Sequence, residues 1–305
     1  MSGDKSFDVI AVGGVCWDVL GTVTRYPALD EKEILGELVE QGGGLAGTAA
    51  VAVARLGGKA AIWGRVADDE YGDKNLREFA REGVDTGHLQ VVAGGASQFA
   101  FCVAQQGSGH RSIFWKPPTV GRLQPKDLDR TALMDCRALM IDGNHVDAAL
   151  QAAEWAHEEG IPTVLDIERP SADKMRLLEL CDYPILPQDY AMQALGIADP
   201  LEAGRSLHRQ LGKLLIVTRG VEGSVAFVED QLHHQPAFRM DKVIDTTGAG
   251  DVFHGAFAYG LTLGYELAQN LRFASAVSAL KCRALGGRTG IPSFPETQAL
   301  LDRGE

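Results

Sequence analysis

The run from Asp245 to Asp251, DTTGAGD, carries the clearest chemical signal in the sequence. Only small residues stand at positions 248–250, and an apolar helical pattern begins at Val252. Such residues leave backbone N–H groups bare at the positive end of a helix, which favours the binding of an anion. Asp251 lies at the same helix end, where the helix field should keep it ionised as a proton acceptor. An anion site beside a carboxylate base is what phosphoryl transfer to a hydroxyl requires.

The same run has a simpler interpretation as a tight connection, because glycine-rich turns before helices are common. Two features favour a site over a plain connection. The run is longer than a turn requires, and it carries aspartate at both ends. We therefore take Asp251 as the candidate base and the small residues before it as the candidate anion site.

A second glycine run, Gly42 to Gly44, comes directly before a small-residue helix predicted at Ala46–Leu56. Adjacent glycines permit close approach of a ligand to the backbone, although the same run could serve as a hinge. Its spacing is not the G-x-G-x-x-G of dinucleotide-binding folds, so a nicotinamide-dependent dehydrogenase is a weak alternative. Asp18 follows the first predicted strand, Phe7–Val12, at the sheet edge where open α/β folds bind ligands. A short polar residue there is also common as a turn or cap.

Two further glycine-containing segments each have an ordinary structural explanation. The segment Thr218–Ser224 follows an apolar stretch and predicts a hairpin whose glycines permit positive φ, with room for a nucleotide to approach. The segment Gly286–Pro292 predicts a helix C-cap followed by a proline stop. The eight histidines show no metal-ligand spacing, and we interpret His254 as a histidine satisfied within its own helix.

These residues must be positioned by an alternation of apolar strands and helical patterns, which is typical of βαβ units and a largely parallel sheet. Strands are predicted at Phe7–Val12, Ala61–Val66, Ala138–Asp142, Thr163–Ile167, Tyr183–Leu186 and Leu214–Thr218, and helices at Ala46–Leu56, Glu70–Glu82, Asp147–Glu159, Asp173–Cys181, Pro200–Leu211, Val252–Gly264 and Leu267–Leu285. Two segments, about 15–40 and 88–120, contain strand and turn patterns without helices. We expect them to form a small β-sheet lid on a single α/β domain.

Composition limits the classes of partner. The 305 residues carry 41 acidic and 29 basic side chains, a net charge of −12, which argues against a nucleic-acid surface. No run approaches the ~18 apolar residues of a membrane span, and the N-terminus lacks the apolar region of a signal peptide. The five cysteines are scattered and never form a C-x-x-C pair, as expected of reduced thiols in the cytoplasm.

Taken together, these segments resemble the ribokinase-like sugar kinases of the PfkB family. The run Asp245–Asp251 with its following helix resembles the family's C-terminal signature, and Gly42–Gly57 resembles its N-terminal signature. The segment Val66–Gly72 is similar to the G-x-D-x-x-G continuation, and the order of these segments fits nearly the whole chain. Within the family, His234–Arg288 is most similar to the sulfofructose kinase branch. The resemblance implies a three-layer α/β/α sandwich with a mostly parallel central sheet and a small β-sheet lid, over residues 1–305.

The family resemblance also implies an activity, the transfer of phosphate from ATP, with Mg²⁺, to a sugar hydroxyl. Asp251 would act as the base, and the amides of Gly248, Ala249 and Gly250 would hold the transferring phosphoryl group. The remaining implied roles are substrate binding by Asp18, Gly43, Gly44, Thr48, Asn144 and Arg169, and nucleotide binding by Thr218, Gly220, Gly223, Gly248 and Gly250. Asp245 and Thr247, with carbonyls near Ala284 and Gly290, match positions where several relatives bind K⁺.

The chain departs from the family pattern at several positions. Thr48 replaces a usual asparagine of the N-terminal signature, and Pro187 and Tyr190 stand where the N-x-x-E motif for Mg²⁺ and phosphate falls. Gln188 and Asp189 are the nearest candidates to replace that motif. Trp115 and Asn144 stand at positions where the sulfofructose kinase branch binds the sulfonate group of its substrate. This difference indicates a substrate other than a sulfosugar. Four basic residues are candidates for binding an anionic or keto-acid sugar: Lys32, Arg111, Lys116 and Arg169.

We therefore predict a kinase that phosphorylates a primary hydroxyl of a ketose or related sugar. A nucleoside kinase on the same fold and a catalytically silent sugar-binding regulator stay open as alternatives. The partners expected are the sugar and ATP, with no nucleic acid and no membrane. The exposed edges of the lid strands also suggest a homodimer through the lid.

Overall fold

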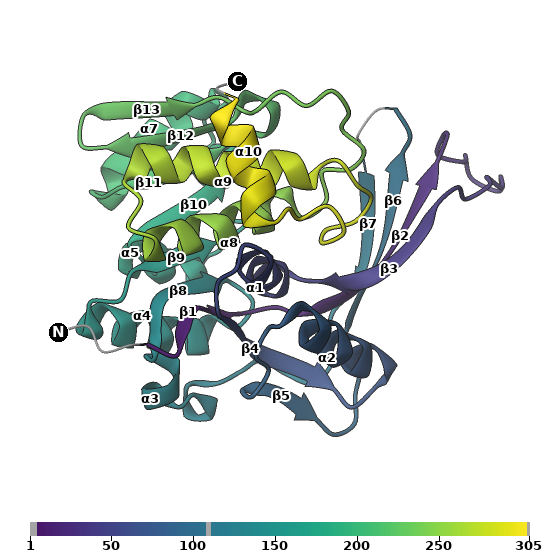
Figure 1. The fold of residues 1–305 in the computed structure, drawn as a ribbon, viewed down its shortest axis with the longest axis horizontal. Helices are drawn as coiled ribbons and strands as arrows, with labels where there is room; N and C mark the ends of the chain where they lie inside the picture. The colour runs from purple at the N-terminus through teal and green to yellow at the C-terminus, as the bar shows by residue number, and fades with distance from the viewer. Residues whose placement is uncertain (1–4, 108–110, 304–305) are drawn as a thin grey trace.

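The computed structural model describes residues 5–107 and 111–303 and has a nine-stranded sheet between two layers of helices (Figure 1). The strands of this sheet, in spatial order, are β13 (Gln231–Gln235), β12 (Ser224–Val228), β11 (Leu215–Thr218), β10 (Tyr183–Pro187), β9 (Thr163–Asp166), β8 (Cys136–Asp142), β1 (Phe7–Val12), β4 (Ala60–Ala67) and β5 (Leu89–Val92). From β11 to β5 every neighbouring pair is parallel, and β12 and β13 add an antiparallel edge. The predicted three-layer, mostly parallel fold is confirmed.

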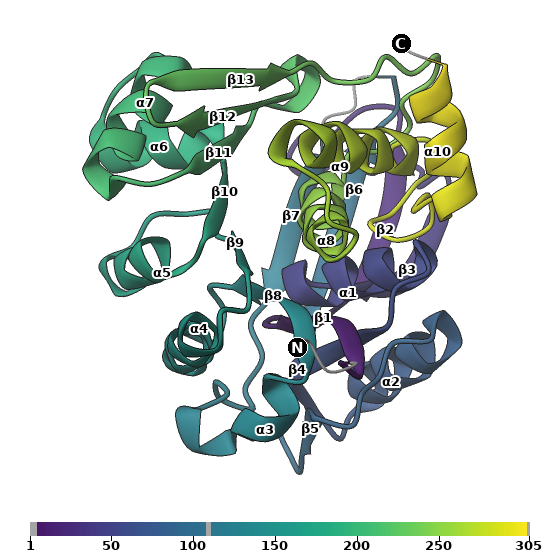
Figure 2. The ribbon, with the colours of Figure 1, turned by 60° about the vertical axis from the view of Figure 1, so that its left-hand side comes forward.

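Both faces of the sheet are buried, which explains why the middle residues of its central strands are apolar. In β1, Val9 and Ala11 join the core on one face, while Ile10 and Val12 join the core on the other. Figure 2 shows the two helical layers on either side of the sheet. One layer contains α1 (Leu45–Arg55), α8 (Ala249–Thr262) and α9 (Leu267–Lys281), with α2 (Glu70–Glu82) beside α1 and α10 (Phe294–Asp302) beside α9; the other contains α3 (Arg130–Leu133), α4 (Val146–Glu159), α5 (Met175–Leu180), α6 (Gln188–Leu195) and α7 (Pro200–Leu211).

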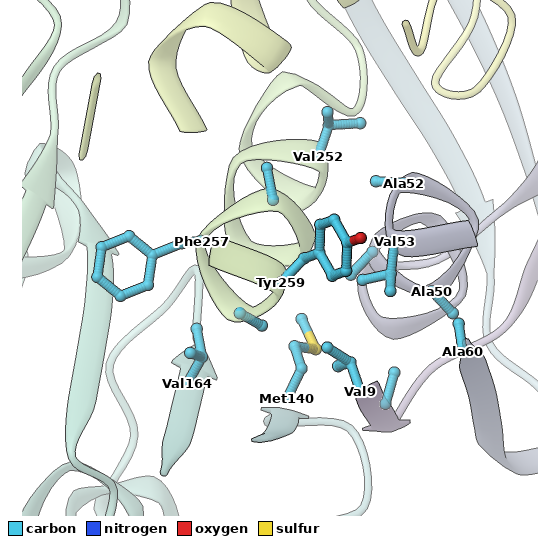
Figure 3. Packing of buried hydrophobic residues seen from close by; sticks show 14 of the residues in the cluster. Val9, Ala50, Ala52, Val53, Ala60, Met140, Val164, Val252, Phe257 and Tyr259 are labelled. Atoms are coloured by element: carbon cyan, nitrogen blue, oxygen red, sulfur yellow. The ribbon is translucent and has the colours of Figure 1, made fainter. Parts of the chain in front are cut away.

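Helix α8 is the central element of its layer. The sequence pattern predicted one apolar face, but the structure buries every residue from Val252 to Gly260. The reason is that α8 packs against α1 and α9 and also against the strands β8 and β9. Figure 3 shows Tyr259 of α8 beside Val53 of α1, with Met140 of β8 below them. A helix held on all sides can present its first turn to the sheet edge in a fixed position.

The lid is a separate four-stranded sheet that projects from the sandwich (Figure 1). Its spatial order is β3 (Leu38–Gly43), β2 (Cys16–Val23), β6 (Gln98–Gln105) and β7 (Arg111–Lys116). The prediction was wrong for Leu89–Val92, which forms β5 of the main sheet because it pairs in parallel with β4. Positions 108–110 of the predicted lid segment lie outside the described residues.

The last long helix ends four residues earlier than predicted, at Lys281. The chain turns away there because Cys282 O accepts a hydrogen bond from Ile244 N at 2.8 Å, which ties the helix end to the start of the DTTGAGD run. Within the described part of the chain, no helix combines the length and apolarity needed to span a membrane.

Candidate active site

Asp251 lies in the first turn of α8, directly after the small-residue turn. Gly248 is the N-cap residue and has a φ of 74°, a left-handed conformation that favours glycine. N–H groups in the first turn of a helix have no acceptor within the helix, so they are free for an anion. The Ala249 N–H is an exception, because it donates to Thr246 O at 3.2 Å. The candidate anion site is therefore smaller than predicted and centres on Gly248 and Gly250.

The surroundings of Asp251 act on its pKa in the direction opposite to the helix end. Burial raises the pKa of its carboxyl well above the ordinary value, and the negative charges of Asp166 and Glu168 act in the same direction. The His254 ring opposes this rise only in part. The sequence suggested that the helix end favours the ionised carboxylate, and the fold adds an opposing influence because it gathers other carboxylates around Asp251. A raised pKa brings a carboxyl closer to neutral pH, where a general base works most efficiently.

Asp166 is the buried carboxylate that the sequence reasoning missed. It ends β9, and burial together with the charges of Glu168 and Asp142 raises its pKa well above the ordinary value. Its Oδ2 receives no hydrogen bond from the residues that the structure describes, although His254 Nδ1 lies 3.3 Å away. His254 itself is satisfied as predicted, by Gly250 O at 2.7 Å and Ile185 O at 2.9 Å. An unpaired buried oxygen beside the candidate base is a place where a cation could bind.

Asp18 lies in β2 of the lid. Its charge is close enough to Asp251 to raise the pKa of that carboxyl. Burial raises the pKa of Asp18 itself, against the influence of Cys16 and Arg288. The neighbouring strand β3 needs glycine at position 43, because a Cβ at Gly43 would lie 2.1 Å from Asp18 Oδ2. The structure thus brings Asp18 and Gly43 together, within electrostatic reach of Asp251.

An arginine from the far end of the chain supports the Gly42–Gly44 run. Arg288 Nη2 donates to Gly43 O at 2.9 Å, and its Nη1 donates to Glu78 Oε1 at 3.1 Å. Glu78 Oε2 in turn accepts from Gly42 N at 2.9 Å. A Cβ at Gly42 would lie 2.1 Å from Arg288 Nη1, so the glycine makes room for the guanidinium. The hinge interpretation of this run is not supported, because a buried ion pair fixes its backbone.

Asp142, at the end of β8, connects the turn after β1 to the first helix. Its Oδ2 accepts from Gly14 N at 2.7 Å and from Ala46 N at 3.2 Å, and its Oδ1 accepts from Asn144 N at 2.8 Å. Gly44 has a φ of 84°, and a Cβ there would lie 2.4 Å from Gly14 O. Asn144 is exposed beside this turn. These contacts place Asn144 and Gly44 at the same edge of the sheet.

Asp245, the first residue of the run, is almost fully buried and has a structural role. Thr247 N and Oγ1 donate to its Oδ1 at 2.9 and 2.7 Å, and Gly286 N donates to its Oδ2 at 2.8 Å. Burial would raise the pKa of Asp245, but the charge of Lys281 and these hydrogen bonds hold it below the ordinary value. Lys281 Nζ also donates to the carbonyl oxygen of Asp245 at 2.9 Å. The oxygens of Asp245, which were expected to bind K⁺, therefore already accept hydrogen bonds from donors of the chain.

The other two residues of the predicted K⁺ site are also closely packed. A Cβ at Gly290 would lie 2.1 Å from Lys281 O and 3.3 Å from the Cβ of Ala284. Within residues 5–107 and 111–303, no group of three or more His, Cys, Asp or Glu side chains is arranged to hold a metal ion. The donor set around Asp245 does not fit K⁺, and the charge at this position is supplied by lysine.

The predicted nucleotide segment forms the hairpin between β11 and β12. Gly220 and Gly223 have φ values of 55° and 89°, as the turn prediction required. A Cβ at Gly223 would lie 2.1 Å from Gln235 O, so packing against β13 already requires glycine there. Thr218 ends β11, and its Oγ1 lies 3.5 Å from Leu186 O. The hairpin stands at the carboxyl ends of the parallel strands, the edge that also carries Asp166.

The remaining predicted residues differ in accessibility. Thr48 is buried within α1, whereas Arg169 is exposed after β9. At the position of the N-x-x-E motif, Tyr190 is buried and Asp189 is exposed in the first turn of α6. Arg111 of the lid donates from Nη1 to Thr246 Oγ1 at 3.0 Å, which brings the lid against the DTTGAGD run.

The chain was compared with known proteins. The model of the pfkB carbohydrate kinase family matches residues 6–293. Mouse (Mus musculus) ketohexokinase is 26% identical over 93% of this chain and 98% of its own. A provisionally named ribokinase from Agrobacterium tumefaciens has a TM-score of 0.90 at 27% identity, covering 99% of both chains. Arabidopsis thaliana ribokinase, solved with ribose and ATP, has a TM-score of 0.84 at 22% identity, covering 97% of this chain and 98% of its own.

These likenesses agree with the geometry of the site. The family match begins before β1 and ends at the N-cap of α10, so it includes every element that carries a candidate site residue. The acidic first turn of α8, the glycine run before α1 and the lid lie within the matched residues. This protein belongs to the pfkB family of carbohydrate kinases.

Proposed function

We propose that this sugar kinase uses ATP to phosphorylate a primary hydroxyl of a ketose or related sugar. The observation that supports this most directly is the position of Asp251 in the first turn of α8, beside free backbone amides and within electrostatic reach of Asp18. The amides suit the transferring phosphoryl group, and the two carboxylates suit a hydroxyl between them.

In the proposed step, the sugar hydroxyl oxygen attacks the γ-phosphorus of ATP and Asp251 takes the hydroxyl proton. The new bond joins oxygen to the γ-phosphorus, the bond from the γ-phosphorus to the β–γ bridging oxygen breaks, and ADP leaves with the electron pair. The N–H groups of Gly248 and Gly250 stabilise the negative charge on the phosphoryl oxygens. Asp18 and the backbone at Gly43 and Gly44 orient the sugar, which contributes through positioning.

Mg²⁺ is the second expected cofactor, and the residues near Asp251 suit it. The unpaired Oδ2 of Asp166 and the exposed carboxylate of Glu168 are oxygen ligands of the kind that Mg²⁺ prefers. Such an ion needs only one or two protein carboxylates when it also binds the phosphates of a nucleotide. Bound there, Mg²⁺ would neutralise phosphate charge. Asp166 and Glu168 are better placed for this than Gln188 and Asp189, because their charges act directly on Asp251.

The assignment to a ketose rests on the relatives and on the chemistry of the lid. The mouse relative is a ketohexokinase, which supports a keto sugar as the substrate. Trp115 and Lys116 are exposed on β7, and Arg111 already reaches Thr246. For the nucleotide, we propose the hairpin at Thr218, Gly220 and Gly223, since it shares the sheet edge with the anion site. The Arabidopsis structure contains ribose, which is an aldose, and ATP, so it supports a sugar and ATP as the two substrates.

The test is a coupled assay of ADP release with ATP and Mg²⁺ over ketoses, aldoses, keto-acid sugars and nucleosides. We expect a ketose to give the highest kcat/KM. Turnover of adenosine or inosine above every sugar would instead indicate a nucleoside kinase, and no ADP release with any acceptor would indicate a silent sugar-binding protein.

The role of Asp251 is tested separately with Asp251→Asn. We expect kcat to fall by about 10²- to 10⁴-fold, the usual contribution of a general base. ATP binding, measured by calorimetry, should remain. A variant with unchanged kcat would exclude Asp251 as the base.

A further inference from the structure

Lys281 is a buried lysine that the proposed reaction does not use. It is the last residue of α9, its exposed fraction is 0%, and its Nζ donates to Asp245 O at 2.9 Å. Lysine is almost never fully buried unless its charge is compensated. A buried ammonium at this position therefore needs an explanation, and its surroundings provide one.

The ammonium contacts one of two loops that meet at the N-terminus of α8, residues 244–248 and residues 282–290. Ile244 N donates to Cys282 O at 2.8 Å, and Gly286 N donates to Asp245 Oδ2 at 2.8 Å. A Cβ at Gly248 would lie 2.7 Å from the Cα of Gly287, so the loops touch at the N-cap of α8. The position of the first amides of α8 thus depends on how these loops are held together.

The junction brings opposite charges together. Asp245 brings a carboxylate whose oxygens accept three hydrogen bonds from Thr247 and Gly286. Lys281 brings the opposite charge to the backbone carbonyl of Asp245. The lysine lies at the negative end of the α9 dipole, which favours a positive charge. A K⁺ ion would satisfy the same need for positive charge, but a second cation here would be repelled by the ammonium.

We propose that the Lys281 ammonium takes the place of a monovalent cation between the two loops, so that catalysis does not depend on added K⁺. The inference rests on the proposed phosphoryl transfer. Lys281 is a positioning residue in this account, because it touches the loop that carries the anion site and not the reacting atoms. Its effect is to keep the amides of Gly248 and Gly250 in place when the phosphoryl group arrives.

The first test uses the unmodified protein, freed of K⁺ and NH₄⁺. KCl is varied up to about 0.15 M, with choline chloride holding the ionic strength constant so that screening does not change. We expect kcat and the affinity for ADP, measured by calorimetry, to change less than about twofold, well below the tenfold effect of 1.4 kcal/mol. Saturable activation by K⁺, or ADP binding only in K⁺, would overturn this inference but not the proposed function. Absence of ADP binding in every salt would overturn the proposed function and the inference with it.

The second test removes the charge with Lys281→Met, which keeps most of the side-chain volume. We expect kcat to fall at least about tenfold, since a misplaced transition-state donor costs about 10²- to 10³-fold. K⁺ or NH₄⁺ should restore part of the lost kcat and raise the Tm of this variant, because either ion can enter the vacated position.

The matched control is Lys213→Met. Lys213 Nζ also donates to backbone carbonyls, those of Glu179 and Cys181, but these lie away from the anion site. This control should lose stability without any response to K⁺. An equal response to K⁺ in both variants, or full kcat in Lys281→Met, would show that Lys281 does not act as the cation.

Discussion

Removal of the Arg288 guanidinium should affect stability and sugar binding together. In Arg288→Met, the carboxylate of Glu78 stays buried without its partner, since both side chains are at most 5% exposed. Breaking a buried pair in this way costs about 3–5 kcal/mol of the free energy of unfolding. With an unfolding entropy of about 2.1 cal/mol/K per residue, 305 residues give roughly 0.6 kcal/mol/K, so Tm should fall by about 5–8 °C.

The kinetic consequence follows from the second hydrogen bond of Arg288. The loss of its Nη2 bond to Gly43 O frees the backbone next to Asp18, so kcat/KM for the sugar should fall. A hydrogen bond to a charged group contributes about 1.5–3 kcal/mol, which corresponds to a fall of about 10- to 100-fold. The KM for ATP should change little, because the nucleotide hairpin does not contact this pair.

The double variant Arg288→Met with Glu78→Gln separates charge from packing. Glutamine can still accept from Gly42 N but leaves no buried charge, so the double variant should unfold at a higher temperature than Arg288→Met alone. Thermal denaturation and sugar kinetics of the two variants decide the matter. If Arg288→Met loses less than about 1 kcal/mol, or if the second change restores nothing, the ion-pair argument is refuted.

Three further predictions concern the base, the glycine run and the lid. Because the pKa of Asp251 is raised, kcat/KM should fall with decreasing pH at a higher pH than for an ordinary carboxyl; a limb at the pH of an ordinary carboxyl would contradict this. Gly43→Ala should raise the sugar KM, because its Cβ would overlap the carboxylate of Asp18, and an unchanged KM would mean that Asp18 does not bind the sugar. We propose a homodimer through the lid, because its β7 residues Phe114 and Trp115 are 64% and 61% exposed. The variant Phe114→Glu should shift the sedimentation of the protein from dimer to monomer. If the unmodified protein is a monomer, this interface is excluded.

The sequence predicted a largely parallel α/β fold because its strands and helices carry local patterns. Apolar runs bounded by turns indicated the parallel strands, and α2 and α7 occur at the predicted residues because their polar and apolar positions follow the helical period. The prediction was wrong where pairing partners decided the outcome. Leu89–Val92 has an ordinary strand pattern, and only its pairing with β4 places it in the main sheet and not in the lid.

Part of the site was visible in the same way. Glycines next to a helix start and an aspartate in the first turn are neighbours in the chain, so the anion turn and Asp251 could be recognised without a fold. Asp166 also carried a signal that went unused, because a carboxylate at the end of an apolar strand lies at the edge where such sheets bind ligands.

The rest of the site depends on contacts between distant parts of the chain. Arg288 and Gly43 are 245 residues apart, and an arginine after a helix looks in sequence like a solvated surface charge. Lys281 likewise looks like the ordinary last residue of a helix until the fold buries it against Asp245. The raised pKa of Asp251 also arises from carboxylates on other elements.

The sequence by itself therefore determined the type of chemistry, because an anion turn and its base are encoded within seven consecutive residues. The tertiary structure decided how that chemistry is supported: which charges surround Asp251, what fixes the glycine run, and whether lysine or an added ion balances Asp245. The physical reason is that electrostatic effects depend on distance and burial, and both are set only when separate segments of the chain pack together.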